Sequence, residues 1–406
     1  MKSTESKIPQ FYDISDEELH AVNTVYRKIL EKAKIYGYDE IQTSSFELKD
    51  RYLSATNVHP SKIFEAVRPK QRTTFLLASD LAMSISRFIA DLPTIPPVVK
   101  LIQLNNLFRD RIPEISGYRR EFKQVLLGVW GSPSFFYDAE LIDITYRSLQ
   151  EIQGIQLNYL QISNHDIFNA VSPGLAQEIR FNGIEKLIES DLSSSDKAIL
   201  LSLFHQGTVP ITEFFDIASN IKNEEIQKEV EKVKTVYHYL HTLQFPGKIL
   251  FSLSNFGGTG HYTGMNYRIY ANLREEKGVL IADGGRINNL CQKFNPTKEI
   301  DAVCMGIGIQ VIAQKLFFAQ KEKVLLILPE KELNQAMYQI LIIRKILSDY
   351  RVSILPLPTL ERKKQFFQSP FYQNCCFIFY EKEHIEVRSD NPEQKATIEK
   401  LLCTFL

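Results

Sequence analysis

The sequence lacks an excess of either charge, because its 48 lysines and arginines are balanced by 48 aspartates and glutamates. Proteins that bind nucleic acid usually carry a basic excess or a basic stripe. Long apolar runs are also missing: no stretch approaches the roughly 18 apolar residues of a membrane-spanning helix, and the N-terminus has no apolar signal segment. We therefore expect a cytoplasmic protein that acts neither in a membrane nor mainly on nucleic acid.

Cysteine is scarce, and its few positions have no CxxC spacing. The five cysteines are Cys291, Cys304, Cys375, Cys376 and Cys403. An odd, unpatterned set fits neither a disulfide framework nor a structural zinc site. His238 and His241 have the spacing of one helix face, but no third ligand stands near them in the sequence. We predict structural thiols, no metal and no cofactor.

The length of 406 residues is large for one hydrophobic core, so we expect two domains. Residues 1–321 mix predicted strands and helices, and about 166–245 read as consecutive helices, which indicates a helical insertion. Residues 322–406 have a β-α-β order that predicts a separate α/β domain with a three-layer core. The expected fold class is α+β.

Local signals in the first third of the chain predict particular elements. Ser15 and Glu18 form a capping box before a helical apolar repeat that Gly37 closes. Another helix should begin after Ser79 or Asp80. Two apolar segments, VVKLIQLNNLFRDR and EFKQVLLGVWG, flank a loop with proline and glycine. They predict a long antiparallel hairpin.

Arginines gather on this predicted hairpin, among them Arg109, Arg119 and Arg120. A solvated face of salt bridges is the commonest fate of such a cluster. The alternative is an anion pocket, because planar guanidinium groups bind phosphates and carboxylates with paired hydrogen bonds. The cluster by itself leaves both interpretations open, so the surrounding motifs have to decide.

The surrounding motifs resemble those of a known family. They are GYDEIQTSSFE (37–47), LFRDR with GYRREFKQ, HYTG (261–264), GGR (284–286) and VCMGIGIQVI (303–312). In this order they resemble the motifs of histidyl-tRNA synthetase, a class II aminoacyl-tRNA synthetase, over nearly the whole chain. The resemblance implies an antiparallel sheet core with a helical insertion, a C-terminal domain like an anticodon-binding domain, and self-association as a dimer through the first motif.

The chain departs from that family where charge is needed to activate an amino acid with ATP. Val311 stands at the position of the third-motif arginine, and Gly257 at that of a second catalytic arginine. Arg111 replaces the glutamate that helps to fix adenine. Neutralising the phosphates in the transition state requires such cations. We therefore expect no synthetase activity and no catalytic residues.

The amino-acid pocket implied by the resemblance is also altered. Ala82 replaces a threonine, Gly128 the glutamate that reads the histidine ring, and Ile287 the tyrosine after GGR. Six residues remain as a candidate pocket for histidine or another effector: Asp80, Arg109, Arg120, Gln124, Tyr262 and Arg286. A carboxylate and an ammonium group need only a cation and an anion within reach, so an amino-acid-sized ligand suits this set.

A synthetase-like chain without its catalytic charges resembles the regulatory subunit of ATP phosphoribosyltransferase. The resemblance implies a non-catalytic protein that joins the short-form catalytic subunit in a hetero-octamer. It also implies a role in the first step of histidine biosynthesis and in feedback inhibition by histidine. Two alternatives stay open: an active histidyl-tRNA synthetase, and an inactive synthetase-like module that binds RNA or protein.

Overall fold

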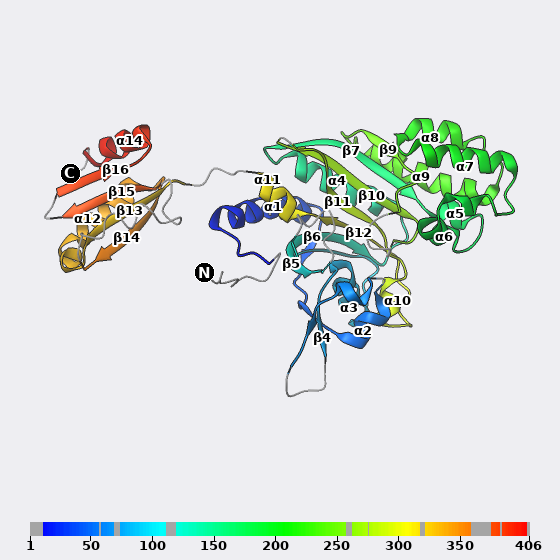
Figure 1. Ribbon diagram of the computed structural model, residues 1–406, viewed down its shortest axis with the longest axis horizontal. Helices are drawn as coiled ribbons and strands as arrows, with labels where there is room; N and C mark the ends of the chain where they lie inside the picture. Colours follow the sequence, from blue (N-terminus) through cyan, green and yellow to red (C-terminus); the bar gives the residue numbers. More distant parts are fainter. Residues whose placement is uncertain are drawn as a thin grey trace, which may run out of the picture. The chain divides into compact units, whose positions relative to one another are not determined.

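The computed structural model divides the chain into two compact units, Met1–Phe318 and Ala319–Leu406 (Figure 1). The sequence placed the boundary after residue 321. The described residues are 11–56, 58–68, 74–110, 119–256, 262–274, 276–316, 321–358, 375–381 and 384–403.

A sheet of nine strands forms the centre of the first unit, in the order β1-β5-β6-β12-β11-β10-β7-β9-β8. Most neighbours are antiparallel; β1 runs parallel to β5, and β9 parallel to β7. The strands are β1 (Asp39–Glu40), β5 (Val99–Phe108), β6 (Glu121–Trp130), β7 (Ile155–Asn164), β8 (Val209–Pro210), β9 (Ile249–Phe251), β10 (Met265–Leu273), β11 (Glu276–Arg286) and β12 (Ala302–Ile307). The α+β fold class is thereby confirmed.

The predicted hairpin is present as β5 and β6, which pair antiparallel from Val99 and Trp130 to Phe108 and Glu121. Both strands are largely buried because each contributes side chains to apolar clusters on the two faces of the sheet. The Pro113 and Gly117 positions of the loop lie outside the described residues.

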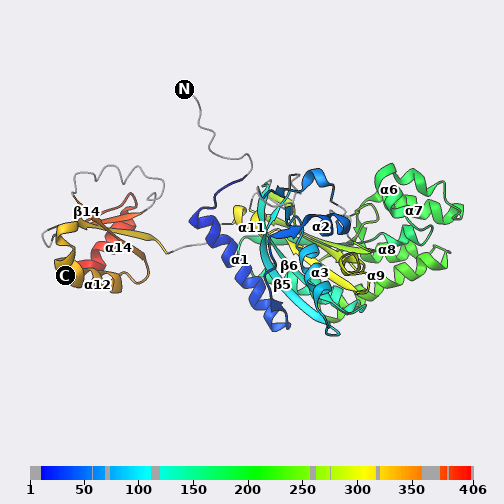
Figure 2. The same cartoon turned by 90° about the horizontal axis from the view of Figure 1, so that it is seen from below.

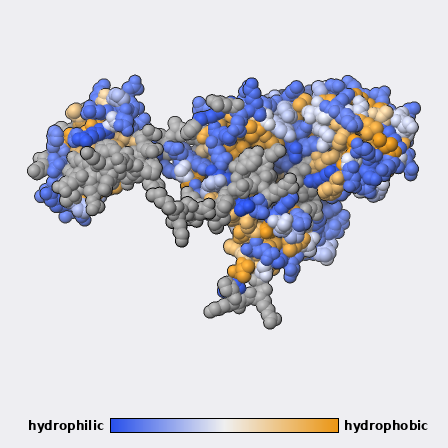
Figure 3. Space-filling model, viewed as in Figure 1, coloured by the Kyte–Doolittle hydropathy of each residue, from blue (hydrophilic) through white to orange (hydrophobic). Residues whose placement is uncertain are grey.

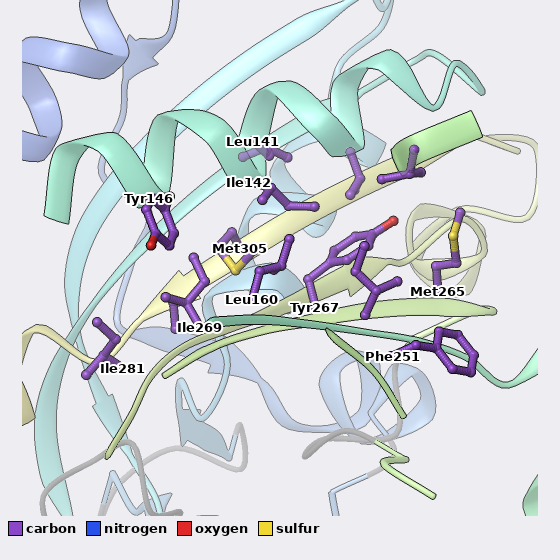
Figure 4. Close-up of a cluster of buried hydrophobic side chains, with 14 of the residues drawn as sticks. Leu141, Ile142, Tyr146, Leu160, Phe251, Met265, Tyr267, Ile269, Ile281 and Met305 are labelled. Carbon is purple, nitrogen blue, oxygen red and sulfur yellow. The ribbon is translucent and has the colours of Figure 1, made fainter. Parts of the chain in front are cut away.

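One face of the sheet is covered by α1 (Asp16–Ile35), α4 (Phe136–Gln150) and α11 (Ile309–Lys315). The Ser15 half of the predicted capping box is present, since Ser15 Oγ accepts a hydrogen bond from Glu18 N at 3.4 Å, whereas the Glu18 carboxylate pairs with Arg119. In Figure 4, Ile142 of α4 points toward strand side chains that include Leu160 and Met305. This packing fixes the face on which α4 side chains meet β11 and β12.

The other face packs against α2 (Lys49–Ala55), α3 (Leu81–Asp91) and α10 (Leu290–Phe294). Beside them, β2 (Phe46–Leu48), β4 (Phe75–Leu77) and β3 (Glu65–Ala66) form a three-stranded sheet in the order β2-β4-β3. The N-cap of α3 is Asp80, whose carboxylate accepts from Ala82 N at 2.8 Å. Asp80 is therefore the correct one of the two predicted caps.

The helical insertion consists of α5 (Asp166–Asn169), α6 (Leu175–Asn182), α7 (Ser194–Gln206), α8 (Ile211–Ala218) and α9 (Glu224–Thr242), with a 3-10 turn at Ile184–Leu187. These helices gather at one end of the sheet, beyond β7 and β9 (Figure 1). Figure 2 shows α6, α7, α8 and α9 together at that end, to the right of β5 and β6. Their buried residues belong to the same apolar cluster as α4, so the insertion is part of the first unit's core.

The second unit contains a four-stranded sheet in the order β14-β13-β15-β16. Its elements are β13 (Lys323–Pro329), α12 (Leu333–Ile346), β14 (Arg351–Leu357), β15 (Cys376–Glu381), β16 (His384–Arg388) and α14 (Pro392–Cys403). Both helices pack on one face of this sheet, where Ile340 and Ile398 share a cluster. The described part of this unit therefore has two layers, the sheet and one layer of helices, where the sequence predicted three.

Candidate functional site

Asp80 and Arg109 form the centre of the candidate site. Their side chains are paired at 3.5 Å, and both are about nine-tenths buried. Arg109 also donates from Nε to the Ser79 carbonyl and lies 5.7 Å from the Phe122 ring. Arg109 follows the last residue of β5, and Asp80 immediately precedes α3. A hydrogen bond from Phe108 N to Ala78 O, at 2.9 Å, brings these two segments together. The guanidinium group is therefore held between a carboxylate, a carbonyl and an aromatic ring.

Arg119 and Arg120 of the basic cluster have acidic partners of their own. Arg120 pairs with Asp110 at 2.9 Å and is partly exposed. Arg119 pairs with Glu18 of α1 at 2.9 Å and lies 5.3 Å from the Tyr12 ring. For Arg119 and Arg120 the salt-bridged interpretation of the cluster holds.

Gln124 and Tyr262 lie on the same face of the sheet as Asp80. The Gln124 amide is so close to β12 that a Cβ on Gly306 would meet its Nε2 at 2.9 Å. Burial, together with the carboxylate of Asp283, the Cys304 thiol and the Asp80 carboxylate, raises the pKa of Tyr262 well above its usual value. The structure therefore brings Asp80, Arg109 and Tyr262 into one neighbourhood, with Gln124 beside it.

Arg286, the sixth candidate, is directed to the opposite face of the sheet. Arg286 on β11 is the direct neighbour of Val303 on β12, and Val303 belongs to the apolar cluster under α4. Its guanidinium group pairs with the fully buried Asp138 of α4 and donates to the Ser134 carbonyl at 2.9 Å. It also lies 4.3 Å from the Phe135 ring. Arg286 thus ties α4 to the sheet.

An ion pair that the sequence analysis missed lies on the site face. Arg268 of β10 and Asp283 of β11 are direct neighbours in the sheet, with Nε and Oδ1 3.5 Å apart. Both side chains are more than four-fifths buried, and both charges influence the pKa of Tyr262. The polar residues that alternate with apolar ones on these two strands are visible in the sequence. Their pairing depends on the register between β10 and β11, which the sequence does not show.

Gly128 lies beneath the ring of Trp130. A Cβ at Gly128 would be 2.5 Å from Trp130 Cη2 and 3.2 Å from the Val303 carbonyl oxygen. Trp130 is completely buried and donates from Nε1 to Ser86 Oγ at 3.2 Å. Indole therefore occupies the space into which a side chain at position 128 would extend.

The other altered positions are apolar and buried where they are described. Val311 is 5% exposed and packs in the cluster with α1, and Ile287 is 1% exposed. Gly257 and Arg111 lie outside the described residues. In the part of the chain that the structure describes, no group of three or more His, Cys, Asp or Glu side chains is arranged to hold a metal ion.

The charges on the site face are thus arranged in pairs of opposite sign. Arg109 lies against Asp80, and Arg268 against Asp283. A guanidinium group that already has a carboxylate partner offers less charge to an anionic ligand, because binding must compete with the internal pair. Such a face suits a small zwitterionic or neutral polar ligand better than a triphosphate.

The sheet, the hairpin and the surrounding helices define a class II aminoacyl-tRNA synthetase-like protein. Within that class the chain belongs to the histidyl-tRNA synthetase family, whose sequence profile matches residues 10–312.

Sequence relatives and solved structures agree with this placement. A histidine–tRNA ligase of Helicobacter pylori is 25% identical over 72% of this chain and 69% of its own. One from Sulfurisphaera tokodaii is 23% identical over 96% and 95%. A Bacillus halodurans C protein described as an ATP phosphoribosyltransferase regulatory subunit/histidyl-tRNA synthetase superposes with a TM-score of 0.75 at 18% identity, covering 94% of this chain and all of its own. Histidyl-tRNA synthetase from Nostoc sp. PCC 7120 gives 0.66 at 15%, covering 98% of this chain and all of its own.

Within the described ranges, no helix combines the length and the apolar composition needed to cross a bilayer.

Proposed function

We propose that this chain is a non-catalytic regulatory subunit of ATP phosphoribosyltransferase that acts with the short-form catalytic subunit in the first step of histidine biosynthesis. The observation that carries the proposal is the apolar, buried Val311 at the third-motif position. The paired arginines of the site face support it, because Arg109 and Arg268 each have an internal carboxylate. The structural likeness to the Bacillus halodurans C protein points the same way.

A regulatory subunit of this kind acts by assembly. Its binding to the catalytic subunit favours the active arrangement of that subunit, since a partner can shift an equilibrium only by binding one state more tightly. The assembly we propose is a hetero-octamer of the two chains. Histidine would inhibit by favouring the opposite arrangement, with a coupling of about 1–3 kcal/mol.

The direct test measures phosphoribosyltransferase activity of the short-form catalytic subunit from the same organism with and without this chain. We expect kcat/KM to rise at least about tenfold, equivalent to ~1.4 kcal/mol, and the two proteins to elute together as a large complex. Equal activity in both samples would rule the proposal out.

A parallel assay addresses the alternative suggested by the relatives' names, histidine–tRNA ligases. We expect no exchange of labelled pyrophosphate into ATP in the presence of histidine. Exchange above background would identify an active synthetase. If neither activity is found, the remaining alternative is an inactive module that binds RNA or protein.

The feedback site is proposed to be the group formed by Asp80, Arg109, Gln124 and Tyr262. Replacing Gln124 with leucine keeps the volume of this buried side chain but removes its amide. In the reconstituted complex we expect the half-inhibitory histidine concentration to rise about fivefold or more, the lower end of usual allosteric coupling.

The matched control for this variant is Lys123→Ala. Lys123 precedes Gln124 on the same strand, and its ammonium group donates a hydrogen bond to Asn106 Oδ1 at 2.9 Å. Alternate residues of a strand point to opposite faces, so Lys123→Ala should leave inhibition unchanged. An unaltered histidine response in Gln124→Leu would place the effector site elsewhere.

The proposal also includes a homodimer formed by the first-motif region. Phe46 and Leu48 of β2 are 54% and 52% exposed, and Val67 is 79% exposed. Figure 3 shows apolar surface around the three-stranded sheet, at the lower centre of the view. Exposed apolar patches of this kind are typical of protein–protein contacts.

A further inference from the structure

The first helix of the second unit, α12, exposes apolar side chains that the fold of that unit leaves uncovered. Tyr338 is 72% exposed, Leu341 57% and Met337 45%. Leu341 lies three residues after Tyr338 and four after Met337, so the three side chains share one face of the helix. The opposite face is occupied, because Ala336, Ile340 and Ile343 are buried against the sheet. The exposed face, which we call the α12 face, is the one turned away from the described core of its own unit.

Charge is distributed unequally along α12. Arg344 and Lys345 are exposed in its last turn. Glu330 and Glu332 flank Lys331 in the 3-10 turn immediately before its first residue, which leaves this turn with one net negative charge. Because the apolar residues lie at the middle of the 14-residue helix, the element has an acidic start, an apolar centre and a basic end.

This distribution is self-complementary. When two such helices pack antiparallel about a two-fold axis at their centres, each apolar patch covers the other, and each basic end lies beside the acidic start of its partner. A two-fold interface requires that one patch be complementary to itself. A parallel arrangement would instead place like charges together, which is unfavourable.

We propose that α12 pairs antiparallel with α12 of a second copy of this chain, joining the C-terminal units of two molecules. The contact is small compared with the roughly 1,200–2,000 Å² of a stable interface, so it acts together with another contact between the same chains. A second contact becomes effectively intramolecular once the first has formed. The inference does not depend on the catalytic subunit; it rests on the proposed homodimer, whose first-motif contact supplies the other contact between the two chains.

Cysteine cross-linking in the full-length chain tests the arrangement. Cys403, which is exposed, is first replaced by serine. Tyr338→Cys in this background places a thiol near the proposed axis, where helices 8–10 Å apart bring facing residues within disulfide reach. Mild oxidation should give a covalent dimer, and mass spectrometry should show a disulfide joining the two introduced thiols at position 338.

The matched control is Phe181→Cys on α6, because Phe181 is 71% exposed and equally aromatic. We expect at least about fivefold more cross-linked dimer from Tyr338→Cys than from Phe181→Cys, since a disulfide needs its two Cα atoms within about 7 Å. Equal yields would overturn the proposal. So would a disulfide from position 338 to any other cysteine, which would show that the α12 face covers another surface.

The charge argument has its own test in the Tyr338→Cys background. Reversing the basic end, with Arg344→Glu and Lys345→Glu, should reduce the yield of dimer. Adding Glu330→Lys and Glu332→Lys to the same chain restores opposite signs at the contact and should recover it. If neither change alters the yield of dimer, the antiparallel pairing is contradicted. Circular dichroism of each variant verifies that the helices are intact.

Discussion

Replacing Asp138 with alanine is expected to lower the free energy of unfolding of the first unit by about 3–5 kcal/mol. Asp138 is fully buried, and it accepts hydrogen bonds from Arg286 and from the Tyr267 hydroxyl, the latter at 2.6 Å. Without this carboxylate the buried Arg286 guanidinium loses its ion-pair partner and keeps the Ser134 carbonyl and the Phe135 ring. The loss is large compared with the 5–15 kcal/mol that stabilise a typical domain.

The ion pair itself contributes less than its removal would suggest. Burial raises the pKa of Asp138 above its usual value, and the attraction of Arg286 offsets this only in part. A buried pair often adds little compared with apolar residues of similar size, whereas one member left alone is costly. The double replacement Asp138→Leu with Arg286→Met should therefore be much closer to the original stability than Asp138→Ala.

Urea denaturation followed by tryptophan fluorescence measures both variants, because Trp130, the single tryptophan, lies in the core of the first unit. Ser148→Ala on the same helix serves as the control: its buried hydroxyl donates a single-turn hydrogen bond to the Ile144 carbonyl at 2.6 Å, so its loss should have a small effect. A cost below about 1 kcal/mol for Asp138→Ala would show that Arg286 finds another partner.

The role of Arg286 illustrates what the sequence left undetermined. The segment GGR was interpreted as part of a ligand pocket because it resembles a pocket motif. Which face an arginine occupies depends on strand register, and a shift of one residue reverses every side chain of a strand. The pairing of Arg286 with Val303 places it under α4, and that pairing has no local signature in the sequence.

Elements with local signals were predicted well. The helix after Ser15 and the helix after Asp80 have side-chain caps within a few residues of their starts, and the β5–β6 hairpin follows from apolar runs on both sides of a turn. Contacts between residues distant in sequence were missed, because no local signal identifies the partner. Glu18 is 101 residues from Arg119, and Arg268 meets Asp283 only through the register of β10 and β11, which an irregularity after Ile269 interrupts.

Gly128→Glu is the second replacement with a large expected effect. It introduces the carboxylate that histidyl-tRNA synthetases use to read the histidine ring, so a retained pocket would accept it. In this structure the new Cβ alone would be 2.5 Å from Trp130 Cη2. Overpacking typically costs about 1–3 kcal/mol, and an unpaired buried carboxylate adds several more. We expect a total of about 4 kcal/mol or more and no gain in histidine affinity.

Two further variants separate the steric cost from the electrostatic cost. Gly128→Ala adds only the Cβ and should lose about 1–3 kcal/mol. Combining it with Trp130→Phe, which shortens the ring, should recover part of that loss, so the two effects should not be additive. If Gly128→Glu instead folds normally and binds histidine in calorimetry, the Trp130 indole must be able to leave the space above position 128. The amino-acid pocket would then be intact, and the introduced carboxylate would strengthen histidine binding at the feedback site proposed for Asp80, Arg109, Gln124 and Tyr262.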